Sequence, residues 1–177
     1  MSWWTRPAPP TSWSDVSESD AARLRVIGLG NGILTDDAVG LHVARAVRRQ
    51  LEQGAGPPGV DVVEAEVGGF ALMELMAGWD AVVLVDAVQL EGVAAGSVVA
   101  LEPSDLGVSL RLLAPHEIDL VTALAVGDRL GYPMPRRVHI IGIQGADLST
   151  FGEELTPQVQ AAVPRAEQAV LRLLGQL

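Results

Sequence analysis

A short apolar run that enters a glycine-rich turn and then an amphipathic helix is the feature that most constrains the fold of this chain. Residues 24–29 read as a buried strand, glycines stand at positions 28, 30 and 32, and residues 37–51 repeat apolar side chains at helical spacing. Glycine allows the backbone to approach a neighbouring group closely. A strand, turn and helix in this order are typical of open α/β sheets, where such turns line the ligand crevice.

Apolar runs and helical patterns alternate along the rest of the chain. Ten residues, 87–96, connect the third expected strand to the fourth. Because a parallel crossover normally needs about a dozen residues or more, we expect the fourth strand to be antiparallel to the third. These patterns predict a three-layer α/β/α sandwich with a five-stranded, mostly parallel sheet and one antiparallel strand. Besides residues 24–29, the expected strands are 60–65, 81–85, 97–101 and 138–143, and the expected helices are 37–51, 70–76, 117–130 and 156–174.

The length of 177 residues suffices for one domain with a substantial core, and we expect that domain to span residues 23–177. Residues 1–22 are rich in proline and serine and are expected to form a flexible tail. The tail holds three of the four tryptophans, so a docking segment for a partner is the alternative interpretation. No apolar stretch reaches about 18 residues, and the N-terminus lacks the apolar part of a secretory signal, so we expect no membrane contact and a cytoplasmic location.

Composition excludes several classes of function. The net charge is −10 and the chain has no lysine, which makes nucleic acid an unsuitable partner because phosphate neutralisation dominates that affinity. The chain also has no cysteine, which removes disulfides, thiolate metal ligands and cysteine nucleophiles. Any metal site must therefore use histidine, aspartate, glutamate or backbone groups.

Two aspartates and one histidine are the candidate site residues. Asp37 follows the glycine turn, and Asp86 comes directly after the apolar run 81–85. Because parallel strands end at the same edge of a sheet, both carboxylates are expected there. His116 follows Pro115 in a loop just before an expected helix. Two oxygens and one nitrogen suit a borderline divalent ion such as nickel or zinc, and they equally suit acid–base hydrolysis without metal.

Other polar residues near this edge leave alternatives open. Asp36 could cap the first helix in place of Asp37, or could replace it in the site. Glu66 could reach the same crevice, although an exposed loop carboxylate is the simpler interpretation. We interpret His42 and His139 as structural.

Six segments in this order resemble the hydrogenase maturation proteases, the endopeptidases that process the large subunit of nickel–iron hydrogenases. The resemblance runs from about residue 25 to the C-terminus and implies a three-layer α/β/α sandwich with one antiparallel strand. It also implies that nickel is bound by Asp37, Asp86 and His116, the positions that match the acidic residue after the turn, the strand aspartate and the loop histidine of the family. The matching segments are residues 28–40, 67–69, 82–87, 115–117, 141–143 and 155–157.

The resemblance implies an aspartyl-type endopeptidase whose nickel belongs to the substrate. The partner is the precursor of a nickel–iron hydrogenase large subunit, from which a short C-terminal peptide is removed. Asp37 or Asp86 is the candidate general base, or nickel polarises the carbonyl or activates water. Other divalent ions, such as zinc or cadmium, can occupy the site. A non-catalytic nickel-sensing chaperone of the same partner is the alternative function.

Three positions depart from the family pattern. Asp37 is one methylene shorter than the glutamate often found there, and Ala38 replaces a common glycine. Gln144 stands where relatives often place an acidic residue, so a partner contact or the subgroup specificity is expected to change.

Two other classes of protein share part of the glycine turn. A dinucleotide-binding module would need a third glycine at Ile33 and an acidic residue earlier than Glu64, and the pair of aspartates would repel pyrophosphate. A peptidyl-tRNA hydrolase-like enzyme would need a basic face and a histidine shortly after the turn, where this chain offers only His42 on a helix.

Overall fold

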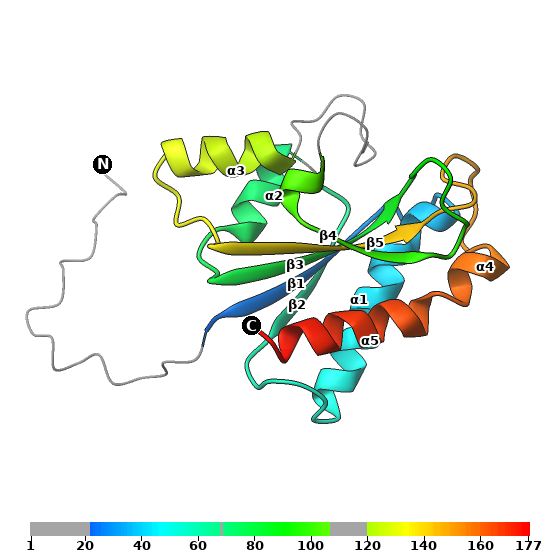
Figure 1. Ribbon diagram of the computed structural model, residues 1–177, viewed down its shortest axis with the longest axis horizontal. Coiled ribbons are helices and arrows are strands. Elements are labelled where there is room, and N and C mark those ends of the chain that lie inside the picture. Colours follow the sequence, from blue (N-terminus) through cyan, green and yellow to red (C-terminus); the bar gives the residue numbers. More distant parts are fainter. Residues whose placement is uncertain (1–21, 68, 107–119) are drawn as a thin grey trace, which may run out of the picture.

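Five strands form one sheet, and helices cover both of its faces (Figure 1). The computed structural model describes residues 22–67, 69–106 and 120–177. The strands are β1 (Leu24–Leu29), β2 (Asp61–Ala65), β3 (Ala81–Val88), β4 (Val98–Leu101) and β5 (Arg137–Gln144). The helices are η2 (Asp36–Ala38), α1 (Val39–Glu52), α2 (Gly69–Met76), η3 (Pro103–Leu106), α3 (Leu120–Arg129), α4 (Pro157–Gln160) and α5 (Val163–Leu174).

The strand order is β2-β1-β3-β5-β4. The pairs β1–β2, β1–β3 and β3–β5 are parallel, and β4 pairs with β5 in the antiparallel direction. The predicted sheet with one antiparallel strand is therefore confirmed. The short link after β3 does reverse the chain, although β4 lies beside β5 at the edge of the sheet rather than beside β3.

The helices form two layers, with α1 and α5 on one face of the sheet and α2 and α3 on the other (Figure 1). Alternate side chains of β3 enter two separate cores, as expected for a strand whose successive residues point to opposite faces. Val83 and Val85 pack toward α1 and α5, whereas Val82 and Leu84 pack toward α2 and α3. Every residue of β3 is buried, which explains its nearly continuous apolar sequence.

The first expected helix forms, but it begins with a tighter turn. Residues 36–38 make the 3-10 helix η2, and the α-helix begins at Val39. Val39, Val43, Ala46 and Val47 are buried on one face of α1, as their spacing predicts. The sequence pattern therefore located this helix, while the tight first turn, which carries Asp37, was not foreseen.

The prediction of one helix over residues 156–174 was wrong. The structure has two helices, α4 and α5, with a break at residues 161–162. Pro164 lies in the first turn of α5. Because proline lacks an amide hydrogen and its ring clashes with the carbonyl four residues earlier, which here belongs to Gln160, a continuous helix cannot run through this position.

The third strand is longer than predicted, since it continues through Asp86 to Val88. Pairing with β5 extends over eight positions, and Asp86 lies opposite Gly142. The helix expected over residues 117–130 is observed from Leu120 to Arg129, and residues 117–119 lie outside the described part. Residues 1–21 also lie outside it, so the tail stays a prediction.

Within the described ranges, no helix is both long enough and apolar enough to cross a membrane.

Candidate functional site

Close backbone packing brings the start of α1 against the ends of two central strands. A Cβ atom at Gly40 would collide with the carbonyl oxygens of Leu29 in β1 and Val85 in β3. Gly30 has a φ of 152°, and a Cβ atom there would collide with the carbonyl of Asp37. Only glycine fits at such points of contact. The glycines therefore place η2, and with it Asp37, directly beside the segment of β3 that carries Asp86.

Asp37 is half-buried at this edge of the sheet. Its Oδ2 accepts a hydrogen bond of 2.9 Å from the backbone amide of Asn31. Burial raises the pKa of Asp37, and the hydrogen bond from Asn31 opposes this change. The turn thus holds the carboxylate in place through Oδ2, while Oδ1 accepts no hydrogen bond from the described residues.

Asp86 is nearly inaccessible to solvent, with 8% of its surface exposed. It continues the side of β3 that carries Val82 and Leu84, so it points toward the layer of α2 and α3. Burial raises the pKa of Asp86 to about 8, the charge of Asp37 adds to this, and a hydrogen bond from the amide of Ala87 opposes it. A carboxyl group in such surroundings holds its proton near neutral pH.

The carboxylates of Asp37 and Asp86 interact electrostatically. Because the charge of Asp37 raises the pKa of Asp86, ionising both groups at once is unfavourable. Such a pair holds a proton, or a cation that takes the place of the proton. The donor set therefore fits either acid–base chemistry or the binding of a divalent ion supplied from outside.

The neighbouring Asp36 has a different environment, since none of its surface is exposed. Oδ2 accepts hydrogen bonds from the amides of Ala146 and Asp147, both at 2.9 Å, and from Oγ1 of Thr156 at 3.0 Å. Oδ1 accepts a bond of 2.7 Å from the amide of Thr156. Both oxygens are thus occupied by the loop that follows β5, which gives Asp36 an anchoring position rather than one beside Asp86.

Glu66 is exposed, and its Oε1 accepts a hydrogen bond of 3.1 Å from the amide of Gly32. This contact joins the end of β2 to the glycine turn. Glu66 therefore lies at the edge of the candidate site, in keeping with the simpler interpretation of an exposed loop carboxylate.

His116 lies outside the described residues, so its place in the site stays a prediction. The helix that follows it, α3, packs on the same face of the sheet toward which Asp86 points. Across residues 22–67, 69–106 and 120–177, no three histidine, aspartate or glutamate side chains gather as a metal site. Asp37 and Asp86 are brought together, but no third side chain of these types joins them within the described residues.

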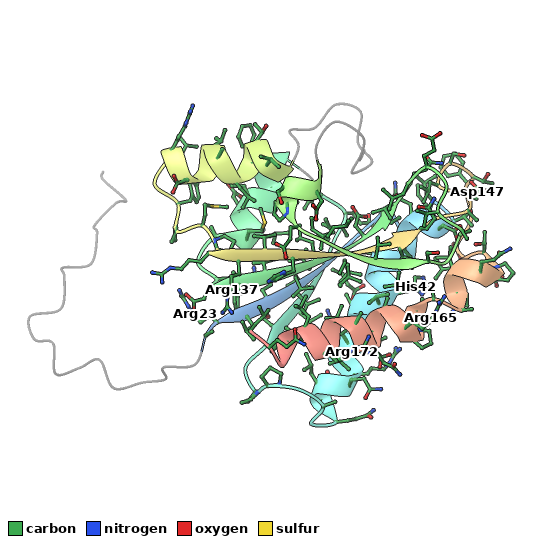
Figure 2. The ribbon with its side chains drawn as sticks, in the orientation of Figure 1. Arg23, His42, Arg137, Asp147, Arg165 and Arg172 are labelled. Carbon is green, nitrogen blue, oxygen red and sulfur yellow. The ribbon has the colours of Figure 1, made fainter. Side chains whose placement is uncertain are left out.

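The other two histidines have structural surroundings. His42 lies on α1 (Figure 2), near the charged side chains of Arg45 and Glu64. Its pKa is lowered by burial and by the charge of Arg45, against the opposing effect of Glu64. Nδ1 of His139 lies 2.8 Å from Oε1 of Glu102, which provides the hydrogen-bond partner expected for this strand residue.

Gln144, noted from the sequence as a departure from the family pattern, is buried at the end of β5. Its Oε1 accepts a hydrogen bond of 2.8 Å from the amide of Leu90. The side chain fixes the segment between β3 and β4 and so has a role within the fold.

Two residues of the site region were not singled out from the sequence. Asn31 supplies the amide that holds Asp37, and Thr156 supplies two of the four hydrogen bonds to Asp36. The side chain of Asn31 stabilises the turn, since its Oδ1 accepts a hydrogen bond of 3.1 Å from the amide of Ile33, but the bond to Asp37 uses a backbone amide that any residue except proline supplies. Thr156 offered no local signal, since its partner is 120 positions away in the sequence.

Together, the fold and the site define an α/β/α protein in which two carboxylates meet at the carboxyl edge of the central strands. The family model described as hydrogenase maturation protease, HycI, matches residues 42–173. The chain therefore belongs to the hydrogenase maturation protease family, and the prediction of an enzyme of the peptidase class is confirmed.

Individual relatives agree with this assignment. The hydrogenase 2 maturation protease of Escherichia coli is 26% identical over 153 residues, which cover 86% of this chain and 90% of the relative. The hydrogenase expression/formation protein HupD of Rhizobium leguminosarum is 24% identical, with 87% and 75% covered. The structure of the hydrogenase maturating endopeptidase HybD from E. coli superposes with a TM-score of 0.71 at 25% identity, covering 87% of this chain and 93% of that one.

Proposed function

We propose that this protein is an endopeptidase that removes a C-terminal peptide from the nickel-loaded precursor of a nickel–iron hydrogenase large subunit. The observation that carries the proposal is the pairing of Asp37 and Asp86 at the carboxyl edge of the sheet, where the charge of one raises the pKa of the other. Membership of the hydrogenase maturation protease family supplies the reaction class. We further propose that the protein acts in the cytoplasm.

Nickel in this proposal is part of the substrate. A divalent ion carried by the precursor stabilises both carboxylates in their ionised form and displaces the proton from Asp86. His116 is the proposed third ligand, because an imidazole nitrogen beside two carboxylate oxygens suits nickel. Zinc or cadmium can take the same position. Recognition would therefore depend on whether the precursor already contains its metal.

Asp37 is the more accessible of the two carboxylates, and we assign it the role of general base. It takes a proton from a water molecule whose oxygen attacks the carbonyl carbon of the peptide bond, and it returns this proton to the leaving nitrogen as the C–N bond breaks. Such general base catalysis typically contributes about 10²–10⁴-fold to a rate. Asp86, buried beneath it, then holds the substrate's metal and keeps the peptide bond in place.

The test is a processing assay followed by mass spectrometry. Purified protein is mixed with the nickel-loaded precursor from the same genome and, separately, with nickel-free precursor. We expect a shortened C-terminus only with nickel, and none with Asp37→Ala or His116→Ala. Stable complex formation with the loaded precursor but no shortening would instead favour the non-catalytic nickel-sensing chaperone.

A further inference from the structure

Two large apolar side chains stand exposed on a rigid rim beside the candidate site. Phe151, in the loop after β5, has 78% of its surface exposed, the highest value among the large apolar residues of the described part. Ile33, in the glycine turn, is 59% exposed. Exposed aromatic and aliphatic side chains held in fixed positions are typical of protein interfaces.

Backbone hydrogen bonds join the turn and the loop into one unit, which we name the docking rim (residues 31–35 and 147–152). Leu34 and Phe151 form an antiparallel bridge. The amide of Gly152 donates to the carbonyl of Ile33 at 3.1 Å, and the amide of Thr35 donates to the carbonyl of Thr150 at 3.1 Å. The rim therefore has few ways to rearrange, which lowers the entropy lost when a partner binds.

Two aspartates hold the loop half of the docking rim. The buried carboxylate of Asp36 binds the loop at residues 146, 147 and 156. Oδ1 of Asp147, which Figure 2 places in this loop, accepts hydrogen bonds from the amides of Ser149 and Thr150. Bonds from Thr150 and then from Ser149 lower the pKa of Asp147 to about 2. Asp147 is therefore ionised at neutral pH, where its carboxylate can accept these hydrogen bonds.

The docking rim is continuous with the candidate site. Asn31 at its start holds Asp37, and only Asp36 separates the rim's first segment, which ends at Thr35, from Asp37. A partner that rests on the rim is therefore placed at a fixed distance from the carboxylates.

Charge indicates the nature of that partner. Residues 26–44 and 144–164, which contain the rim and its anchors, have no arginine or lysine, although the chain has 12 basic residues. The same two segments carry five carboxylates, namely Asp36, Asp37, Asp147, Glu153 and Glu154. An apolar surface with an acidic border is complementary to an apolar surface with a basic border.

We propose that the docking rim binds apolar side chains of the hydrogenase large-subunit precursor beside the metal-bearing cleavage site, through Ile33 and Phe151. This inference rests on the proposed function and adds the surface by which the protease holds its substrate. Binding at the rim occurs equally in the ground state and the transition state, so it affects KM more than kcat.

The experiment measures processing of nickel-loaded precursor by Phe151→Ser and Ile33→Ser variants. Leu130→Ser is the matched control, because Leu130 is also exposed, at 65%, and follows α3 at the opposite end of the sheet. We expect KM to rise about tenfold or more in each rim variant, since a large apolar contact is lost, with kcat changed less than twofold and the control unaffected. Unchanged KM in both rim variants, or an equal rise in the control, would overturn the proposal.

The dissociation constant of each complex and the oligomeric state are measured on the same samples. If the unmodified protein binds the precursor without cutting it, the proposed function fails. Weaker binding by the rim variants than by the wild type and the control would then still support the docking rim, whereas equal binding by all of them, or no binding by the wild type, would overturn it. A wild-type dimer that Phe151→Ser converts to a monomer would assign the rim to a second copy of this chain and would also overturn the proposal.

Discussion

Asp86 is a residue whose protonation differs between the folded protein and the unfolded chain. Its pKa is about 8 in the fold, against a value of 3.8 without the fold. Between these values the folded state holds a proton that the unfolded state has released, so the free energy of unfolding falls as pH rises. The stabilising contribution is complete below about pH 4 and is lost as pH rises through about 8.

Replacing Asp86 by asparagine removes this dependence. Asparagine resembles the protonated carboxyl group and does not ionise. We therefore expect the free energy of unfolding of the metal-free Asp86→Asn variant, measured relative to the wild type, to be larger at pH 8 than at pH 5 by on the order of 3 kcal/mol. Denaturant unfolding at both values, in the presence of a chelator, measures the difference. Asp128→Asn, at an exposed position on α3, is the control. Parallel pH curves for the wild type and Asp86→Asn would contradict the raised pKa.

Asp36 is expected to matter for stability rather than for metal binding. In Asp36→Asn one acceptor oxygen becomes an amide that faces the donors of Ala146, Asp147 or Thr156. A buried donor left without an acceptor costs about 1–3 kcal/mol, so we expect a loss of about 3 kcal/mol in the free energy of unfolding. Glu154→Gln, exposed in the same loop, should change it little. Equal midpoints for these two variants in urea would argue against the anchoring role.

At the scale of elements, the contact between α1 and the strand ends should make glycine more stabilising than alanine at one position of the helix. Alanine normally stabilises a helix relative to glycine by about 1 kcal/mol. At Gly40 the added methyl group would meet two strand carbonyls, so we expect Gly40→Ala to destabilise the protein by about 3 kcal/mol or more and to abolish processing. In Gly175→Ala the nearest atom lies 3.6 Å away and φ is −72°, so stability should be unchanged. Thermal unfolding measures this difference, since the midpoint temperature should fall for Gly40→Ala and stay at the wild-type value for Gly175→Ala.

The sequence predicted most elements because their patterns are local. β1 has the expected bounds, Leu24–Leu29, since its apolar run ends at a glycine turn. The end of β3 was missed because Asp86 interrupts the apolar run, whereas pairing with β5 decides where the strand ends. The break before α5 was missed because the apolar repeat continues across it, although Pro164 was a visible signal.

The site was predictable only in part. Asp37 and Asp86 follow from the rule that parallel strands end at one edge, and the structure brings them together. Which of the adjacent aspartates faces Asp86 was not decidable, because the donors that bind Asp36 lie 110 to 120 positions away. Their presence depends on the loop after β5, whose course no local pattern specifies.

At the scale of the whole molecule, the uneven distribution of charge should make the rate of association with the precursor depend on salt concentration. The carboxylate-rich segments at the docking rim lack basic residues, and the chain as a whole carries a net charge of −10. If the precursor has a basic border, salt screens the attraction and slows encounter. We expect the association rate to fall several-fold between low and high salt, with the dissociation rate nearly constant. Stopped-flow mixing with the loaded precursor measures both, and a salt-independent association rate would contradict a charge-guided encounter.

The hydrogen bonds of Asp36 to the loop after β5 also determine when, during synthesis of the chain, the turn that carries Asp37 can take its folded arrangement. Asp37 and Asp86 are synthesised before the residues that anchor the turn, the last of which, Thr156, lies 120 positions after Asp36. On a ribosome, β1, β3 and the glycine turn emerge before the anchoring residues are synthesised. The two carboxylates therefore reach the arrangement seen in the folded protein only after Thr156 has been synthesised, so a nascent chain that stops earlier carries both aspartates without the contacts that fix the turn.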